Sequence, residues 1–311
     1  MDSIKAAVCA GFLLCGLAAE AQATLAKVQE RGALLCGIDR SEAESSSTDE
    51  HGNRAAFDRD LCRAAAVAVL GPSARMDVTY YADDATAMDA LVDGKADLVP
   101  SLSIRSHPVN AAGEARAVSF SQPVLNDATG LMVLRESGIT TAEQLSEQKI
   151  CYLTETETEA NLQQWFTAQH LDLLPFPFQE EGEMEAAFVT DNCAALGGDL
   201  TRLAQTRAST GTRADEFVML QQTFGPDTLA TAYRSGDAEW AGVVAATLDV
   251  LFRGEPQADT KPLLLGWNWS ANVRAAVGTY EELFTRDLGS GSVLKLDQTI
   301  LQPRAPAHDL P

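Results

Sequence analysis

One order of secondary-structure elements occurs twice in this sequence, and the repetition limits the possible folds more than any other feature. The first copy predicts strand 33–38, helix 58–70, strand 76–81, helix 85–92 and strand 96–99. The second copy predicts strand 149–153, helix 157–170, strand 174–178, helix 183–189 and strand 193–196. Two successive βαβαβ units predict an α/β protein of two lobes, each built on a mostly parallel sheet.

Extended segments follow each copy and predict two crossings between the lobes. The first comprises residues 119–128 and 130–134, and the second comprises residues 216–222. A chain that enters a second lobe and later leaves it must cross twice, so we expect a hinge of two crossing segments. Helix 238–252 follows the second crossing. We assign residues 24–122 and 222–311 to lobe 1, and residues 126–219 to lobe 2.

The N-terminus has the pattern of a cleaved secretory signal. Lys5 precedes an apolar run over residues 6–19, and the small-residue triplet Ala21-Gln22-Ala23 follows it. A positive start, an apolar stretch and small residues before the cleavage point are the three parts of such a signal. We expect residues 1–23 to be a signal peptide and the mature protein to be periplasmic.

The mature chain would keep an even number of cysteines, Cys36, Cys62, Cys151 and Cys193. An even number in an oxidising compartment predicts disulfides, and four cysteines allow three pairings. The parallel pattern of the two copies favours Cys36–Cys62 and Cys151–Cys193, which would close each lobe separately. A zinc site is the alternative, but no Cys-x-x-Cys spacing occurs and the histidines are scattered, so we predict no metal.

The formal net charge of −21 argues against two classes of partner. Nucleic acids and anionic membrane surfaces are bound through clustered Lys and Arg residues that neutralise phosphates. We therefore expect no nucleic acid and no membrane surface as a partner.

The stretch from Asp93 to Pro108 carries the first candidate ligand residues. It places Ser101, Ser103 and Arg105 just after the predicted strand 96–99. In open α/β sheets, ligands bind at the carboxyl ends of the strands. The second copy has Gly197-Gly198-Asp199 at the equivalent position. The alternative is a polar surface loop without function. We interpret Asp58, at the start of the predicted helix 58–70, as the N-cap of that helix rather than as a ligand residue.

Several pieces spread over residues 24–302 resemble one family, and the four cysteines lie where its members have theirs. The matching pieces are Leu35-Cys36-Gly37, Phe57-Asp58-Arg59-Asp60-Leu61-Cys62, Gly94-Lys95-Ala96-Asp97, Phe120-Ser121-Gln122-Pro123-Val124, Tyr233–Trp240 and Val277–Phe284. The family is that of the periplasmic amino-acid-binding proteins of ABC importers, in its general L-amino-acid-binding subfamily (solute-binding protein family 3). The resemblance implies the two-lobed periplasmic-binding-protein fold of type II, which closes over an amino acid and delivers it to an ABC permease.

The resemblance also implies roles for particular residues. Ser101 and Ser103 match the family's carboxylate-binding hydroxyls, and Thr156 matches the first Thr of a Gly-Thr-Thr turn. Asp199 matches the Asp that binds the α-ammonium group. Arg105 lies near the position of the family's carboxylate-binding arginine.

This chain departs from the family pattern at the ligand site. Pro108 or Val109 stands where the family arginine belongs, and Glu155-Thr156-Glu157 replaces the Gly-Thr-Thr turn. The segment that usually covers the ligand is Glu42, Ala43, Glu44 and Ser45. Two like charges about 4 Å apart repel by about 4 kcal/mol at an effective dielectric of 20. We therefore expect Glu157 and Asp199 to favour a cationic or amine-rich ligand over common amino acids.

Two alternatives to a solute receptor remain at this stage. One is an exported family member whose ligand binding is altered or lost. The other is a cleft enzyme, because lytic transglycosylases and cyclohexadienyl dehydratases share this fold. A general acid needs an apolar surround that raises its pKa, and none is visible near Glu42, Glu155 or Glu157. We expect no enzyme, no catalytic residue and no cofactor, and a monomeric protein.

Overall fold

The computed structural model describes residues 23–39, 54–105, 113, 115–256 and 265–296. The helices are α1 Thr24–Arg31, α3 Arg54–Leu70, α4 Asp84–Val92, α5 Glu157–Ala168, α6 Glu181–Val189, α7 Leu200–Ser209, α8 Ala238–Arg253, α9 Trp269–Val277 and α10 Tyr280–Asp287, with short 3-10 helices at Arg135–Ser137, Ala142–Leu145 and Gly211–Glu216. The strands are β1 Ala33–Asp39, β2 Arg75–Tyr81, β3 Val99–Ser103, β4 Val118–Leu134, β5 Lys149–Leu153, β6 Leu174–Phe178, β7 Ala195–Asp199, β8 Phe217–Met219 and β9 Phe224–Arg234.

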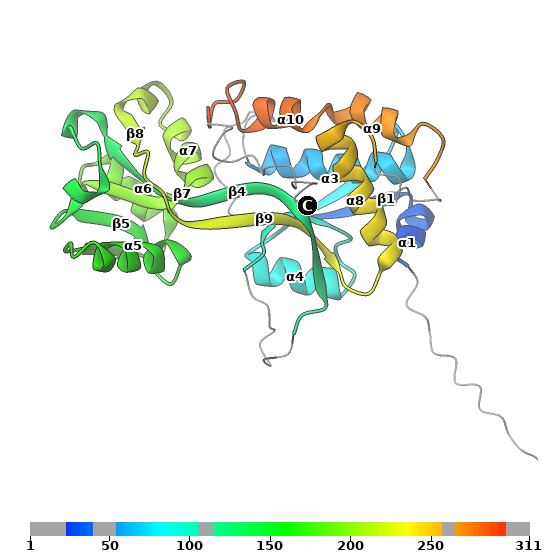
Figure 1. Ribbon diagram of the computed structural model, residues 1–311, viewed down its shortest axis with the longest axis horizontal. Helices are drawn as coiled ribbons and strands as arrows, with labels where there is room; N and C mark the ends of the chain where they lie inside the picture. The colour runs from blue at the N-terminus through cyan, green and yellow to red at the C-terminus, as the bar shows by residue number, and fades with distance from the viewer. Residues whose placement is uncertain (1–22, 40–53, 106–112, 114, 257–264, 297–311) are drawn as a thin grey trace, which may run out of the picture.

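Two lobes are joined by the long strands β4 and β9, which run side by side between them (Figure 1). Lobe 1 contains β1 to β3 with α1, α3, α4 and α8 to α10, and lobe 2 contains β5 to β8 with α5 to α7. Strand β4 is 17 residues long. It pairs with β9 over residues 118–129, then with β7 and β8 inside lobe 2. One seven-stranded sheet, in the order β3-β9-β4-β7-β5-β6 with β8 paired to β4, therefore runs through both lobes.

The sheets are mixed, which corrects the expectation of mostly parallel ones. Strand β1 pairs with β2, and β5 pairs with β6 and β7, all in parallel. Strands β3 and β4 pair with β9, and β4 pairs with β7 and β8, all antiparallel. The β4–β9 pair is antiparallel because the chain crosses to lobe 2 along β4 and returns along β9.

Several boundaries differ from the sequence prediction, and four of these differences bear on the site. Strand β3 covers 99–103 rather than 96–99, and β7 covers 195–199 rather than 193–196, so the predicted ligand loops lie inside strands. Helix α3 begins at Arg54, so Asp58 is not its N-cap. The predicted second crossing, 216–222, contains β8 of lobe 2, and the return strand is β9. Pro100 lies inside β3, where the β3–β9 pairing has an irregularity between Val99 and Leu102 and a strand tolerates proline.

The core of lobe 1 forms on both faces of its sheet. Helix α3 packs with α8, α9 and α10 on one face, and α4 covers the other (Figure 1). Trp240 of α8 is fully buried, and its indole Nε1 donates to the Asp97 carbonyl at 2.9 Å. Tyr280 of α10 donates its hydroxyl to the Val124 carbonyl of β4 at 2.6 Å. These bonds attach the helices of lobe 1 to β4 and to the segment before β3.

Each lobe holds one disulfide, as the sequence predicts. Cys36 of β1 is bonded to Cys62 of α3, with the two Cα atoms 6.0 Å apart. Cys151 of β5 is bonded to Cys193, with a Cα separation of 5.8 Å. Neither bond joins the two lobes. Within the described part of the chain, no helix is long and apolar enough to cross a membrane.

We predict that replacing both Cys36 and Cys62 with serine lowers the free energy of unfolding by about 3–4 kcal/mol. The bond closes a loop with a sequence separation of 26, and its loss frees that loop in the unfolded chain. Urea unfolding followed by circular dichroism measures the change. Non-reducing peptide mapping is the control, and a bond between a lobe 1 and a lobe 2 cysteine would contradict the pairing.

Candidate ligand-binding site

The candidate site is formed by the carboxyl ends of β3, β5 and β7 together with the middle of β4 and β9. Ser103 at the end of β3 lies opposite Leu229 of β9, and Asp199 at the end of β7 lies opposite Thr129 of β4. The two pairings bring the ends of β3 and β7 to the same pair of hinge strands. The predicted residues at the ends of β3 and β7 therefore lie along the same stretch of the hinge.

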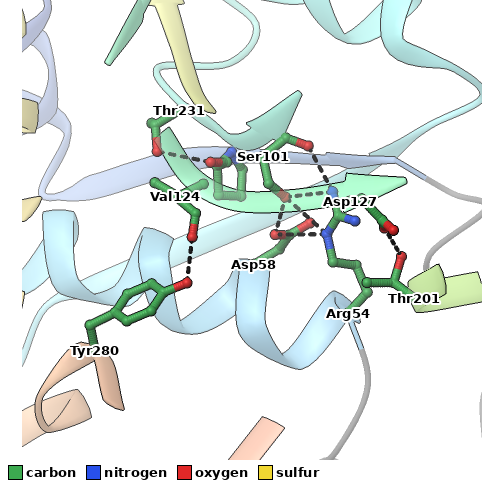
Figure 2. A network of polar contacts seen from close by, with 9 residues as sticks. Arg54, Asp58, Ser101, Val124, Asp127, Thr201, Thr231 and Tyr280 are labelled. Atoms are coloured by element: carbon green, nitrogen blue, oxygen red, sulfur yellow. Dashed lines mark hydrogen bonds and ion pairs between the residues drawn. The ribbon is translucent and has the colours of Figure 1, made fainter. Parts of the chain in front are cut away.

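Ser101 belongs to a buried polar network that the sequence did not reveal (Figure 2). The guanidinium of Arg54 donates to the Ser101 hydroxyl at 3.1 and 3.0 Å and to its carbonyl at 3.1 Å. The Ser101 hydroxyl donates to the carboxylate of Asp58, which also pairs with Arg54 at 3.6 Å. Arg54 and Asp58 are 5% and 2% exposed, so a full ion pair lies in the protein interior. Such a pair is costly to break because either charge alone would remain buried.

Ser103 bonds to a second carboxylate, that of Asp227 on β9. The Ser103 hydroxyl donates to Asp227 Oδ1 at 2.6 Å, and it accepts the backbone N–H of Arg105 at 3.2 Å. Burial raises the pKa of Asp227, and the charge of Glu157 adds to the rise. The Ser103 bond and the charges of Arg54 and Arg105 oppose it. Charged groups from both lobes thus act on one carboxylate in the hinge.

The neighbouring hinge strand carries a third carboxylate, Asp127, whose Cα is the partner of Asp227 in the β4–β9 register. Asp127 is 5% exposed and accepts the backbone N–H groups of Ala128 at 2.8 Å and Leu200 at 3.0 Å. It also accepts the Thr201 hydroxyl at 2.5 Å (Figure 2). Like charges directly opposite on a sheet destabilise it. Asp127 offsets this cost by capping the start of α7, where N–H groups favour a negative charge.

In the turn between β5 and α5, several polar groups are hydrogen-bonded to the last residue of β5 or to the first turn of α5. The Thr156 hydroxyl donates to the Leu153 carbonyl at 2.7 Å and accepts the Glu159 backbone N–H at 3.4 Å, which makes it the N-cap of α5. The Glu155 backbone N–H donates to Glu159 Oε2 at 2.8 Å. Glu155 has φ 61°, a conformation that favours glycine. The residue matched to the family's glycine therefore keeps the glycine-like backbone with a carboxylate side chain.

The structure brings together some of the predicted residues. Ser103 is hydrogen-bonded to Asp227, and the charges of Arg105 and Glu157 act on the same carboxylate, whereas Ser101 faces the Arg54–Asp58 pair. Thr156 acts as a helix cap, and Asp199 is exposed at the start of α7, with no capping bond from its side chain. Pro108, Val109 and the segment from Glu42 to Ser45 lie outside the described residues. No group of His, Cys, Asp or Glu in the described part of the chain could hold a metal ion.

Sequence reasoning missed Arg54, Asp227 and Glu159. Asp227 becomes a site residue only through the pairing of β9 with β3 and β4, which are distant in sequence. Arg54 precedes the predicted start of its helix, so no helical pattern pointed to it. Only the i, i+4 spacing of Arg54 and Asp58 could have indicated their pairing.

Two lobes on paired crossing strands, with polar groups of both lobes at the hinge, define a two-lobed binding protein. The general L-amino acid-binding periplasmic protein AapJ of Rhizobium johnstonii is 30% identical over 94% of this chain and 93% of its own length. The putative amino-acid ABC transporter-binding protein YhdW of Escherichia coli is 27% identical over 89% of this chain and 88% of its own. The chain belongs to the family of periplasmic amino-acid-binding proteins of ABC importers.

A solved structure supports the same assignment. A periplasmic binding protein of an ABC transporter from Brucella ovis, with glutathione bound, superposes with a TM-score of 0.71 and 26% identity. The match covers 89% of this chain and 94% of that one. No family profile matches the sequence. The relatives named here are described as binding proteins, not as enzymes.

We predict that Asp58→Ala lowers the free energy of unfolding by about 3–5 kcal/mol, because it leaves Arg54 buried without this carboxylate. Asp60→Ala is the matched control in the same helix, since Asp60 pairs with the partly exposed Arg286 and should cost about 1 kcal/mol or less. Urea unfolding of both variants gives the comparison. Equal losses would show that burial of the Arg54 pair does not matter.

A second prediction concerns pH. The native pKa of Asp227 lies above its unfolded value, so ionisation costs the folded state stability as pH rises through the native pKa. Asp227→Asn should therefore be more stable than the wild type at neutral pH, and the advantage should shrink as pH falls through the native pKa toward the ordinary Asp value of about 4. Thermal unfolding across this range measures it. Asp77→Asn, on the exposed edge of β2, is the control and should show no such trend.

Proposed function

We propose that the protein is the extracytoplasmic receptor of an ABC importer, which captures an amino acid or a related amine by closing its two lobes. The observation that carries the proposal is the environment of Asp227, which accepts a bond from Ser103 of lobe 1 and feels the charges of Arg105 of lobe 1 and Glu157 of lobe 2. Groups from both lobes act on one point at the hinge. A ligand held there would be enclosed by relative motion of the lobes.

The proposed ligand-binding residues are Ser101, Ser103, Arg105, Thr156, Glu157 and Asp199. Asp199 and Glu157 would bind an ammonium group, because both are carboxylates at the lobe 2 side of the site. Arg105 is the proposed partner of a ligand acid. The acids near the hinge support a preference for a cationic or amine-rich ligand over a neutral or acidic amino acid.

The remaining features belong to the same proposal. The mature protein would begin after residue 23, work as a monomer in the periplasm and deliver its ligand to a permease in the inner membrane. Lobe 1 would comprise residues 24–122 and 222–311, and lobe 2 residues 126–219. We propose a receptor without catalytic activity, since the relatives that it resembles are described as binding proteins.

The test is calorimetric titration of refolded, ligand-free protein with amino acids, diamines and betaines. We expect an amine-rich compound to bind best and leucine and glutamate to bind more weakly than micromolar. Asp199→Asn should weaken the best ligand about tenfold or more, because it removes an ionic partner. The exposed Asp191→Asn is the matched control in lobe 2.

Two results would contradict the proposal at different levels. Micromolar or tighter binding of leucine or glutamate would overturn the preference for amines. Absence of binding for every compound, with the protein folded, would favour the alternative of an exported relative that has lost its ligand.

A further inference from the structure

The hydroxyl donors that would receive a ligand carboxylate in lobe 1 are already used within the chain. A serine hydroxyl carries one proton and can donate one hydrogen bond. Ser101 donates that bond to Asp58, and Ser103 donates its bond to Asp227 at 2.6 Å. A ligand acid could use either hydroxyl as a donor only by displacing a carboxylate of the protein.

In lobe 2, the donors in the turn before α5 are likewise already hydrogen-bonded within the chain. The Thr156 hydroxyl donates to the Leu153 carbonyl at 2.7 Å, and the Glu155 backbone N–H donates to Glu159 Oε2 at 2.8 Å. The Thr154 hydroxyl adds a bond of 3.4 Å to the same Glu159 oxygen. The Glu155 backbone N–H could bind a ligand anion, but it is already hydrogen-bonded to the Glu159 carboxylate of the same chain.

Asp227 differs from Asp58 and Glu159 in its position in the fold. Asp58 lies in α3 of lobe 1 and Glu159 in α5 of lobe 2, whereas Asp227 lies in the hinge strand β9. Two cations of lobe 1, Arg54 and Arg105, stabilise its negative charge, and Glu157 of lobe 2 opposes it. Asp227 thus has a hydroxyl donor and cations around it, which is the environment that a ligand carboxylate requires.

We propose that Asp227 is a built-in substitute for a ligand carboxylate and selects ligands that present an amine, and no free acid, next to β9. The inference rests on the proposed receptor function and names the residue that sets its specificity. An acid about 4 Å from Asp227 would be repelled by about 4 kcal/mol at an effective dielectric of 20. That energy corresponds to about three decades of affinity. An ammonium group in the same place would be attracted by the same charge.

Pairs of ligands that differ only in the acid group test the inference. We choose leucine with leucinamide and lysine with lysinamide, because each amide keeps the amine and side chain and lacks the carboxylate. The wild type should bind each amide more tightly than its acid. In Asp227→Asn, the ratio of acid to amide affinity should rise at least about tenfold, because one repulsive charge is removed.

Three variants serve as controls. Asp77→Asn makes the same chemical change on an exposed strand and should leave the ratio as in the wild type. Ser103→Ala removes the hydroxyl but keeps the charge of Asp227, so it should change the ratio less than Asp227→Asn does. Asp227→Ser is a second neutral variant, used if the asparagine variant does not fold by circular dichroism, and the same rise is expected of it.

The outcomes separate this inference from the receptor function. A wild type that binds the acids as tightly as the amides, or neutral variants with an unchanged ratio, would overturn the role of Asp227 and leave the receptor function standing. Failure of the wild type and every folded variant to bind any of the four compounds or the best ligand of the amine panel would overturn both.

Discussion

The antiparallel pairing of β4 with β9 is the interaction on which the rest of this structure depends. These strands are paired over residues 118–129 of β4, and they lie in the seven-stranded sheet between β3 of lobe 1 and β7 of lobe 2. Because backbone hydrogen bonds set their register, side chains from β3, β7 and α7 are brought to defined points along them. A shift of register by one residue would turn the side chains of Asp127 and Asp227 to the opposite face of the sheet. They would then no longer lie at the candidate site.

Three buried or half-buried carboxylates lie at or beside the candidate site. Each one has a specific partner: Asp58 has Arg54 and Ser101, Asp127 has the start of α7, and Asp227 has Ser103. Buried acids without such partners would shift their pKa upward and lose their charge. The partners oppose this shift, and at Asp227 burial still raises the pKa. The negative character of the site therefore depends on specific partners as well as on an acidic composition.

The sequence predicted the order of elements well because each strand and helix has its own local pattern. Strand β5, helix α8 and both disulfides follow from hydrophobic spacing and from the repetition of the two copies. The centre of the candidate site could not be predicted in this way. Asp227 meets Ser103 at a sequence separation of 124, and Arg54 meets Ser101 at 47. Contacts of this kind depend on sheet topology, which no local pattern contains.

The position of Asp227 also links binding to closure. Glu157 belongs to lobe 2, so movement of lobe 2 toward lobe 1 changes its distance from Asp227, which lies in the hinge. Two negative charges that approach each other in a partly buried site oppose that movement. A ligand shifts a conformational equilibrium only through a difference in its affinity for the two states. A cation between Asp227 and Glu157 supplies such a difference, because it is stabilised by both acids only when the lobes are close, whereas an anion there would hold the lobes apart.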